Sequence, residues 1–82
     1  MNNQLYQQYL NEFVNEAISN SNGSNSDIYA WLAEKQIKGM FVRHKEEKLR
    51  ALADARRAFD EHRHWPTDIV LSHLGVDVKL HP

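Results

Sequence analysis

The sequence predicts a mainly α-helical protein that forms a single small domain over residues 1–82. Apolar residues recur every three or four positions along most of the chain, which is the spacing of amphipathic helices. Its middle is rich in Ala, Leu, Lys, Arg and Glu, which favour helices. Cysteine is absent, so helix packing, association with a partner or a histidine-based metal site must supply the stability that disulfides give other small domains. We expect three to four helices, at about residues 3–19, 26–38, 41–62 and 67–74, and a short C-terminal extended segment at 76–80.

The first expected helix, at residues 3–19, carries adjacent apolar pairs that return every four residues, with Asn, Gln and Glu between them. This wide apolar stripe needs a covering surface, because an exposed apolar patch of this size marks an interaction site. The Ser- and Asn-rich stretch at 19–25 predicts a turn or linker. Ser24 or Ser26 can then cap the second helix, with Asp27 in its first turn.

Gly39 predicts a break or bend near residues 38–41, because glycine is unfavourable inside a helix. The third expected helix, at 41–62, has six positions at alternating three- and four-residue spacing, which is the pattern of a heptad seam. Because two of the six are basic, the seam suits a groove on an acidic partner protein better than a core of its own. The seam comprises Val42, Lys45, Leu49, Leu52, Arg56 and Phe59.

Pro66 ends this helix, because it pushes Trp65 away from α geometry. A short helix at 67–74 follows and ends at Gly75. It has more apolar residues than an exposed helix of this length needs, so we expect it to contact a partner. At 76–80 apolar and charged residues alternate as in a strand, which would pair with a partner strand, or the segment is an extended tail. The partner contacts expected in this region are Trp65, Ile69, Leu71 and Leu74.

The net charge of −1 conceals an uneven distribution. Residues 1–34 carry four acidic residues and no Lys or Arg, whereas residues 35–57 carry eight Lys or Arg against three acidic residues. A basic middle suits nucleic acid or an acidic protein surface, and the alternative is a solvated helix whose charges pair locally. If nucleic acid is the partner, the expected contacts are Lys35, Lys38, Arg43, Lys45, Lys48 and Arg50.

No pattern in the sequence indicates catalysis. Asp60 and Glu61 are neighbours and diverge by about 100° on a helix, so they do not form a facing carboxylate pair. Glycine-rich phosphate loops and nucleophile elbows are absent. His62 and His64 are two residues apart, which does not put both on one helix face, and no clear third ligand accompanies them. We therefore expect no enzyme, no metal, no cofactor and no small-molecule substrate.

Membrane and export signals are also missing from the sequence. No run approaches the roughly 18 apolar residues of a membrane-spanning helix. The first ten residues, MNNQLYQQYL, lack a basic region followed by an apolar stretch, which is the pattern of a secretory signal. We expect a cytoplasmic protein that does not contact a membrane.

The segment FVNEAISNSNGSNSDIYAWL at 13–32 contains a helix, a Gly/Ser turn and then a serine, an acid and an aliphatic residue that open the next helix. The charged segment EEKLRALADARRAFDE follows at 46–61, and WPTDIVLSHL at 65–74 places a proline and an acid before a short aliphatic helix. This order resembles the antitoxins of bacterial type II toxin–antitoxin modules, the ParD and RelB group and the related small plasmid-stability proteins. The resemblance spans residues 13–74.

The resemblance implies a noncatalytic protein that binds and neutralises a small toxin, such as a ribosome-dependent ribonuclease or a gyrase poison, through residues 42–59 and 65–80. Ribbon-helix-helix antitoxins also read DNA through an N-terminal strand, whereas residues 3–19 here are expected to be helical. Two alternatives to an antitoxin remain. One is a DNA-binding transcriptional regulator that uses residues 35–57, and the other is a homodimeric structural or adaptor protein that buries the stripe at 5–18 against a second copy.

Overall fold

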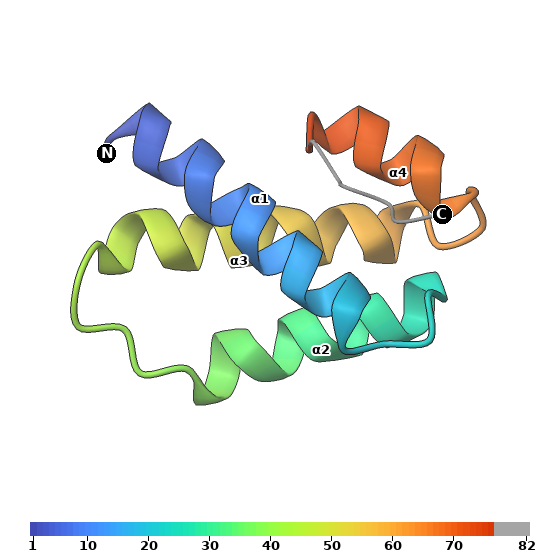
Figure 1. The fold of residues 1–82 in the computed structure, drawn as a ribbon, viewed down its shortest axis with the longest axis horizontal. Helices are drawn as coiled ribbons and strands as arrows, with labels where there is room; N and C mark the ends of the chain where they lie inside the picture. Colours follow the sequence, from blue (N-terminus) through green and yellow to red (C-terminus); the bar gives the residue numbers. More distant parts are fainter. Residues whose placement is uncertain (77–82) are drawn as a thin grey trace.

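Four α-helices make up the described part of the chain. The structure, a computed structural model, describes residues 1–76 and contains no strand in that range. In chain order the helices are α1 (Asn3–Ser19), α2 (Asn25–Lys38), α3 (Lys45–Glu61) and α4 (Thr67–Leu74) (Figure 1). The all-α prediction is confirmed, and three of the helices begin and end within one residue of the predicted bounds.

The central helix of the fold is α3. It packs against α1, α2 and α4 and runs antiparallel to α2, while α1 crosses over this pair (Figure 1). Three alanines of α3, Ala51, Ala55 and Ala58, are buried at these contacts. Their small side chains let the neighbouring helices approach closely, which is how so short a chain forms one core.

The apolar stripe of α1 is covered within the chain. Leu10, Phe13 and Val14 are at most 6% exposed and share one core with residues of α2 and α3. The stripe therefore needs no second copy to cover it. The expectation that a second copy covers residues 5–18 therefore loses its support, because the chain itself buries most of this stripe.

Three residues that the sequence predicted as partner contacts lie in the core instead. Leu52 is fully buried, Phe59 is 1% exposed, and Leu71 of α4 is 5% exposed. All three belong to the core that the four helices share, so the chain itself covers the face of α3 that carries the seam. A stripe at helical spacing marks the inward face of a helix, whether a partner or the same chain covers it.

The residue that caps the start of α2 and the residue that ends α4 are ones that the sequence predicted. Ser24 caps α2, since its hydroxyl oxygen accepts a hydrogen bond of 3.2 Å from the backbone amide of Asp27. Gly75 ends α4 with a φ of 74°, a left-handed conformation that favours glycine, and the Val76 amide donates to the Leu71 carbonyl at 3.1 Å. Apart from Val76, the predicted strand at 76–80 lies outside the described residues.

The third helix begins at Lys45, about four residues later than predicted. His44 before it has a φ of 55° and makes no side-chain capping bond, and this left-handed conformation is strained for a residue other than glycine. Glu46 and Glu47 lie in the first turn, where the helix dipole favours carboxylates. Residues 39–44 therefore form a non-helical connection between α2 and α3.

At the opposite end of the bundle, Asn25 joins two turns of the chain. Its side-chain amide donates to the carbonyl oxygens of Arg63 at 3.2 Å and Trp65 at 2.7 Å. The Thr67 hydroxyl donates to Asn25 Oδ1 at 2.6 Å and lies 3.3 Å from the Gly23 carbonyl oxygen. Asn25 is only 9% exposed, so these bonds satisfy a buried amide. We call this group of residues the polar clasp.

Candidate protein-interaction surface

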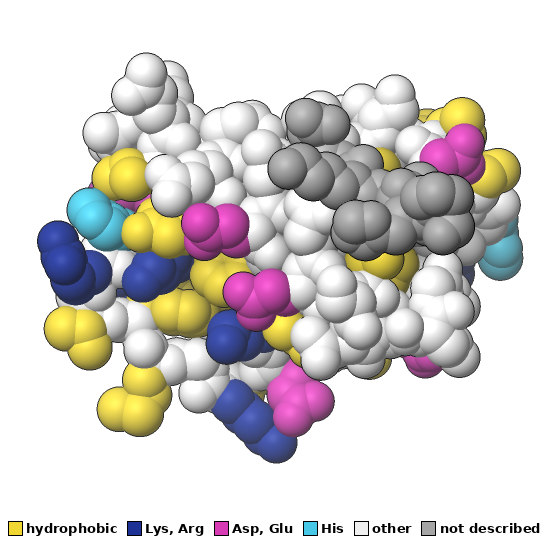
Figure 2. Space-filling model, viewed as in Figure 1, with side chains coloured by type: hydrophobic (Ala, Val, Ile, Leu, Met, Phe, Trp, Pro, Cys, Tyr) yellow, Lys and Arg dark blue, Asp and Glu magenta, His cyan; other side chains and the backbone are white. Residues whose placement is uncertain are grey.

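The end of α2 and the connection that follows it expose three large apolar side chains. Ile37 is 82% exposed, Met40 92% and Val42 90%. Three exposed cations, Lys38, Arg43 and Lys45, lie among and beside them in the sequence. In Figure 2, hydrophobic and basic side chains gather at the end of the molecule where Figure 1 shows this connection. We call these six residues the loop surface.

Phe41 explains why its neighbours point outward. Its ring packs edge-on against Phe13 of the core, with 6.0 Å between ring centroids, and the Lys48 ammonium lies 5.8 Å from the Phe41 centroid. In an extended segment, successive side chains alternate in direction. With Phe41 turned inward, Met40 and Val42 on either side of it therefore face the solvent.

Gly39 provides the space for this anchor. A Cβ atom at Gly39 would overlap both the Phe41 ring and the backbone carbonyl oxygen of Lys35, so an alanine there would push the ring aside and disturb the last turn of α2. Its φ of −69° is open to any residue, so glycine is needed here for close approach and not for backbone conformation. The predicted break at 38–41 is confirmed, and Phe41 packs into the space that Gly39 leaves.

A second set of contacts fixes the beginning of α3 against α1. Tyr9 of α1 faces the ring of His44 at 6.0 Å between centroids, and the Lys48 ammonium lies 5.2 Å from the Tyr9 ring. The backbone amide of Asn2 donates to Glu47 Oε2 at 3.3 Å. The backbone amides of Glu47 itself and of Asn2 lower the pKa of the Glu47 carboxyl. These contacts hold the start of α3, and with it the loop surface, against α1.

The cations of the loop surface are only partly neutralised. Lys38 pairs with Glu34 at 3.2 Å, and both side chains are largely exposed. Arg43 and Lys45 make no ion pair within residues 1–76. An anionic group on a partner therefore has two unpaired cations to meet at this surface.

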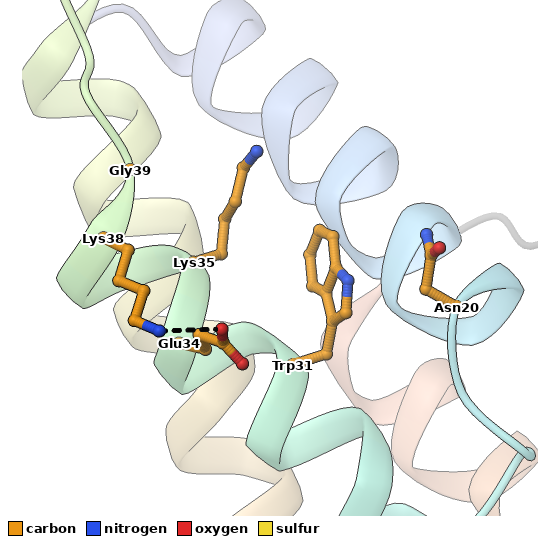
Figure 3. A pocket seen from close by; sticks show the side chains of 6 residues that line it. All are labelled: Asn20, Trp31, Glu34, Lys35, Lys38 and Gly39. Atoms are coloured by element: carbon orange, nitrogen blue, oxygen red, sulfur yellow. Dashed lines mark hydrogen bonds and ion pairs between the residues drawn. The ribbon is translucent and has the colours of Figure 1, made fainter.

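A hollow of about 490 Å³ adjoins the loop surface on α2. Trp31 and Lys35 lie one helical turn apart and point from α2 toward α1, while Lys38 reaches back to Glu34 (Figure 3). The Lys35 ammonium lies 5.8 Å from the Trp31 ring. Trp31 also packs against the core, so one side of its ring is structural and the other forms a wall of the hollow.

The remaining predicted partner contacts fall into three sets, which are residues of the loop surface, exposed residues at the far end of the bundle and half-buried residues. Val42 and Lys45 belong to the loop surface, whereas Trp65 and Ile69 are 40% and 48% exposed near α4, at the far end. Half-buried side chains complete the predicted set, namely Leu49, Arg56 and Leu74.

Ile37 and Met40 were missed by the sequence reasoning. Their signal was present, because Ile37 is off the inner face that Ile28 and Leu32 define and Met40 follows a helix-breaking glycine.

Most of the predicted nucleic-acid contacts gather at the same end of the molecule. Lys35 and Lys38 end α2, Arg43 lies in the connection, and Lys45 begins α3. The other two already have partners within the chain, since Lys48 lies over Tyr9 and Phe41, and Arg50 pairs with Asp54.

Near α4, Trp65 forms a cluster of rings with two histidines. The ring of His62 stacks on Trp65 with 3.8 Å between centroids and an interplanar angle of 15°. His73 meets both rings edge-on, at 5.0 Å from His62 and 5.7 Å from Trp65. Within the part of the chain that the structure describes, no group of three or more potential ligands is placed to hold a metal ion. His62 thus covers one face of the Trp65 ring, and the residue is 40% exposed.

Comparison with known proteins adds no family or fold assignment. No protein-family model matches the chain, and neither does any curated protein or solved structure. Among residues 1–76, no helix combines the length and the apolar character that a lipid bilayer requires.

Proposed function

We propose that the chain is a noncatalytic binding protein that captures a partner protein through the loop surface, and that it serves as the antitoxin of a type II toxin–antitoxin pair. One observation carries this proposal. Six large apolar side chains are exposed in residues 1–76, and three of them, Ile37, Met40 and Val42, lie within six residues of the chain. Exposed apolar side chains bordered by charged residues mark protein-interaction sites.

Burial of these side chains supplies a driving force for binding. Full burial of an Ile, Met or Val side chain contributes about 1.5–3 kcal/mol each. The Phe41 anchor reduces the ordering cost of binding, because the backbone between Gly39 and His44 is already held against α1 and α3. The unpaired Arg43 and Lys45 favour a partner whose apolar patch is bordered by Asp or Glu.

The type II antitoxin resemblance supplies the class of the partner. It supports a small toxin protein, bound by helices and their connections. The proposed contact differs from residues 42–59 and 65–80 in one respect, since Leu52, Phe59 and Leu71 of those segments are buried in the chain's own core. Toxin capture is therefore assigned to residues 37–45.

Co-expression tests this proposal. The protein encoded next to this chain's gene is expressed alone and then with the chain, and growth is measured. Growth arrest that the wild type relieves, and that a variant carrying Ile37→Ser, Met40→Ser and Val42→Ser does not, is the expected result. A Trp65→Ser/Ile69→Ser variant is the matched control, because it removes exposed apolar side chains at the other end. Equal relief by both variants contradicts the proposal.

DNA binding is the second candidate, since Lys35, Lys38, Arg43 and Lys45 gather at one end. If these four contact phosphates, affinity for a promoter fragment should fall about 100-fold between 50 and 200 mM salt. Gln substitutions at the four positions should then weaken binding, whereas the triple serine variant should not. Fluorescence anisotropy of the labelled fragment measures both effects. Salt-insensitive binding, or none, eliminates this candidate.

A further inference from the structure

A second hollow, of about 320 Å³, lies between α2 and α3. Tyr29 contributes its α2 wall. Tyr29 and Trp31 are two residues apart, so their side chains leave α2 about 200° apart and this hollow is separate from the one beside Trp31. Its lining from α3 consists of Arg50, Ala53, Asp54, Arg56, Arg57 and Asp60.

Asp54 already has its partners. Its Oδ2 lies 3.3 Å from Arg50 Nε, and its Oδ1 lies 3.1 Å from Arg57 Nη2. The Tyr6 hydroxyl also donates to Oδ2, at 2.6 Å. Both carboxylate oxygens are therefore in use, and Asp54 neutralises the two arginines on either side of it.

Arg56 has no such partner. Its Nε is buried and makes no hydrogen bond, and its guanidinium forms no ion pair within residues 1–76. Asp60 lines the same hollow one helical turn away, yet it lies beyond ion-pair distance. Of its three guanidinium nitrogens, only Nε is buried without a hydrogen-bond partner, so the Nη atoms are in contact with solvent. Since Arg56 lines the hollow, its Nε edge is shielded from water and its Nη atoms are open to a ligand.

We infer that this hollow is a carboxylate-binding site in which the Arg56 guanidinium, with the Tyr29 wall beside it, receives an acidic side chain. A guanidinium binds carboxylates through paired, charge-assisted hydrogen bonds. The lining carries three arginines and two aspartates, a formal charge of +1 that matches a monoanionic carboxylate better than a phosphate dianion. That the carboxylate belongs to an Asp or Glu of the partner protein rests on the proposed function, whereas carboxylate binding itself does not.

NMR of the arginine side chains tests this inference without a partner protein. The ¹⁵N-labelled chain is titrated with N-acetylglutamate methylamide, and the Nε–Hε signals are followed at constant ionic strength. The Arg56 signal should shift saturably, while that of Arg63, which is exposed and lies in the turn before α4, should not. A parallel titration with inorganic phosphate should saturate only at higher concentration.

Two substitutions sharpen the result. Arg50 and Arg57 line the same hollow, so their Nε–Hε signals should respond to the glutamate derivative in the wild type and not in Arg56→Met. This substitution keeps much of the packing of the side chain and removes the unpartnered Nε, so it should not lower the melting temperature. Asp60→Asn removes a negative charge that repels a bound carboxylate and should tighten binding about two- to fivefold. If Arg56→Met unfolds the chain, Arg56→Lys replaces it and should weaken binding, because lysine lacks the planar donor pair.

The inference is overturned if Arg56 responds no more than Arg63 does, or if phosphate saturates the site before the glutamate derivative. Its failure is separate from that of the proposed function. Loss of toxin neutralisation in the triple serine variant, together with no glutamate response at Arg56, would leave the loop surface supported and this site rejected. The converse pair of results would leave the carboxylate site without an assigned partner.

Discussion

The two ends of the helical bundle differ in the contacts that hold them and in what they expose. At one end the polar clasp joins the turns before α2 and α4 through the buried Asn25 amide, whose partners all belong to the chain. At the other end Phe41 is the inward anchor of the connection between α2 and α3, and Ile37 at the end of α2 and Met40 and Val42 in the connection are exposed. A buried polar group destabilises the fold unless it has hydrogen-bond partners within the chain. Exposed apolar side chains contribute little to stability until a partner protein buries them. We expect stability to depend on the clasp and binding to depend on the loop surface.

The largest expected loss of stability is at Asn25. Asn25→Ala leaves the carbonyl groups of Arg63 and Trp65 and the Thr67 hydroxyl without their partner, so the free energy of unfolding should fall by about 2–4 kcal/mol. Urea denaturation followed by circular dichroism measures this. Ser26→Ala, an exposed change in the same helical turn, is the control and should change stability by less than about 0.5 kcal/mol. Equal losses of unfolding free energy in the two variants would mean that the polar clasp is not what stabilises this end of the bundle.

Gly39→Ala should have the next largest effect. The new methyl group displaces the Phe41 ring from Phe13, and overpacking of this kind costs about 1–3 kcal/mol. A Gly39→Ala/Phe41→Ala double variant should lose less than the sum of the two single changes, since the overlap with the ring is gone and only the overlap with the Lys35 carbonyl oxygen remains. Additive losses in the same denaturation experiment would mean that Phe41 does not anchor the connection.

The stability that Tyr6 contributes, through its bond from α1 to Asp54 of α3, is expected to depend on pH. Burial and the hydrogen bond to Asp54 raise the pKa of the Tyr6 hydroxyl to about 12. The folded state thus favours the neutral phenol, and this stabilisation is complete below pH 10 and disappears as the pH rises toward 12. Tyr6→Phe should lose about 1 kcal/mol at pH 7 and show a shallower decline in stability between pH 10 and 12. Parallel pH profiles for the two proteins would contradict the assignment.

The triple serine variant should show the smallest change in stability. Each of Ile37, Met40 and Val42 is at least 82% exposed, so each substitution should change the free energy of unfolding by no more than about 0.5 kcal/mol. Thermal denaturation of the free protein checks this. A loss of several kcal/mol would show that these side chains already have a structural role.

The helices were predictable because their signals are local. The Ser24 cap, the break at Gly39, the turn before Pro66 and the Gly75 terminus all act within a few residues, and each is present in the structure. The start of α3 was misjudged because it depends on Phe41 packing against Phe13, a contact between segments far apart in the sequence.

The interaction surface was predictable only in part, for a related reason. Helical spacing identifies an inward face without saying which chain covers it, so Leu52 and Phe59 were assigned to a partner although α3 buries them in its own core. Ile37 and Met40 belong to no periodic stripe. Ile37 is exposed because it lies off the inner face of α2, and Met40 because the backbone turns Phe41 inward beside it. Val42 was assigned to a partner surface for its place in the seam, and it is exposed for the same backbone reason.

The most direct test compares the affinity of two matched variants for the purified partner protein. Isothermal titration calorimetry gives the Kd for the wild type, for the Ile37→Ser/Met40→Ser/Val42→Ser variant and for the Trp65→Ser/Ile69→Ser variant. Loss of three buried apolar contacts should raise Kd more than about 100-fold in the first variant. Its rise in the second should stay within about threefold. A greater loss of affinity in the Trp65→Ser/Ile69→Ser variant would contradict the account and move the interaction surface to α4.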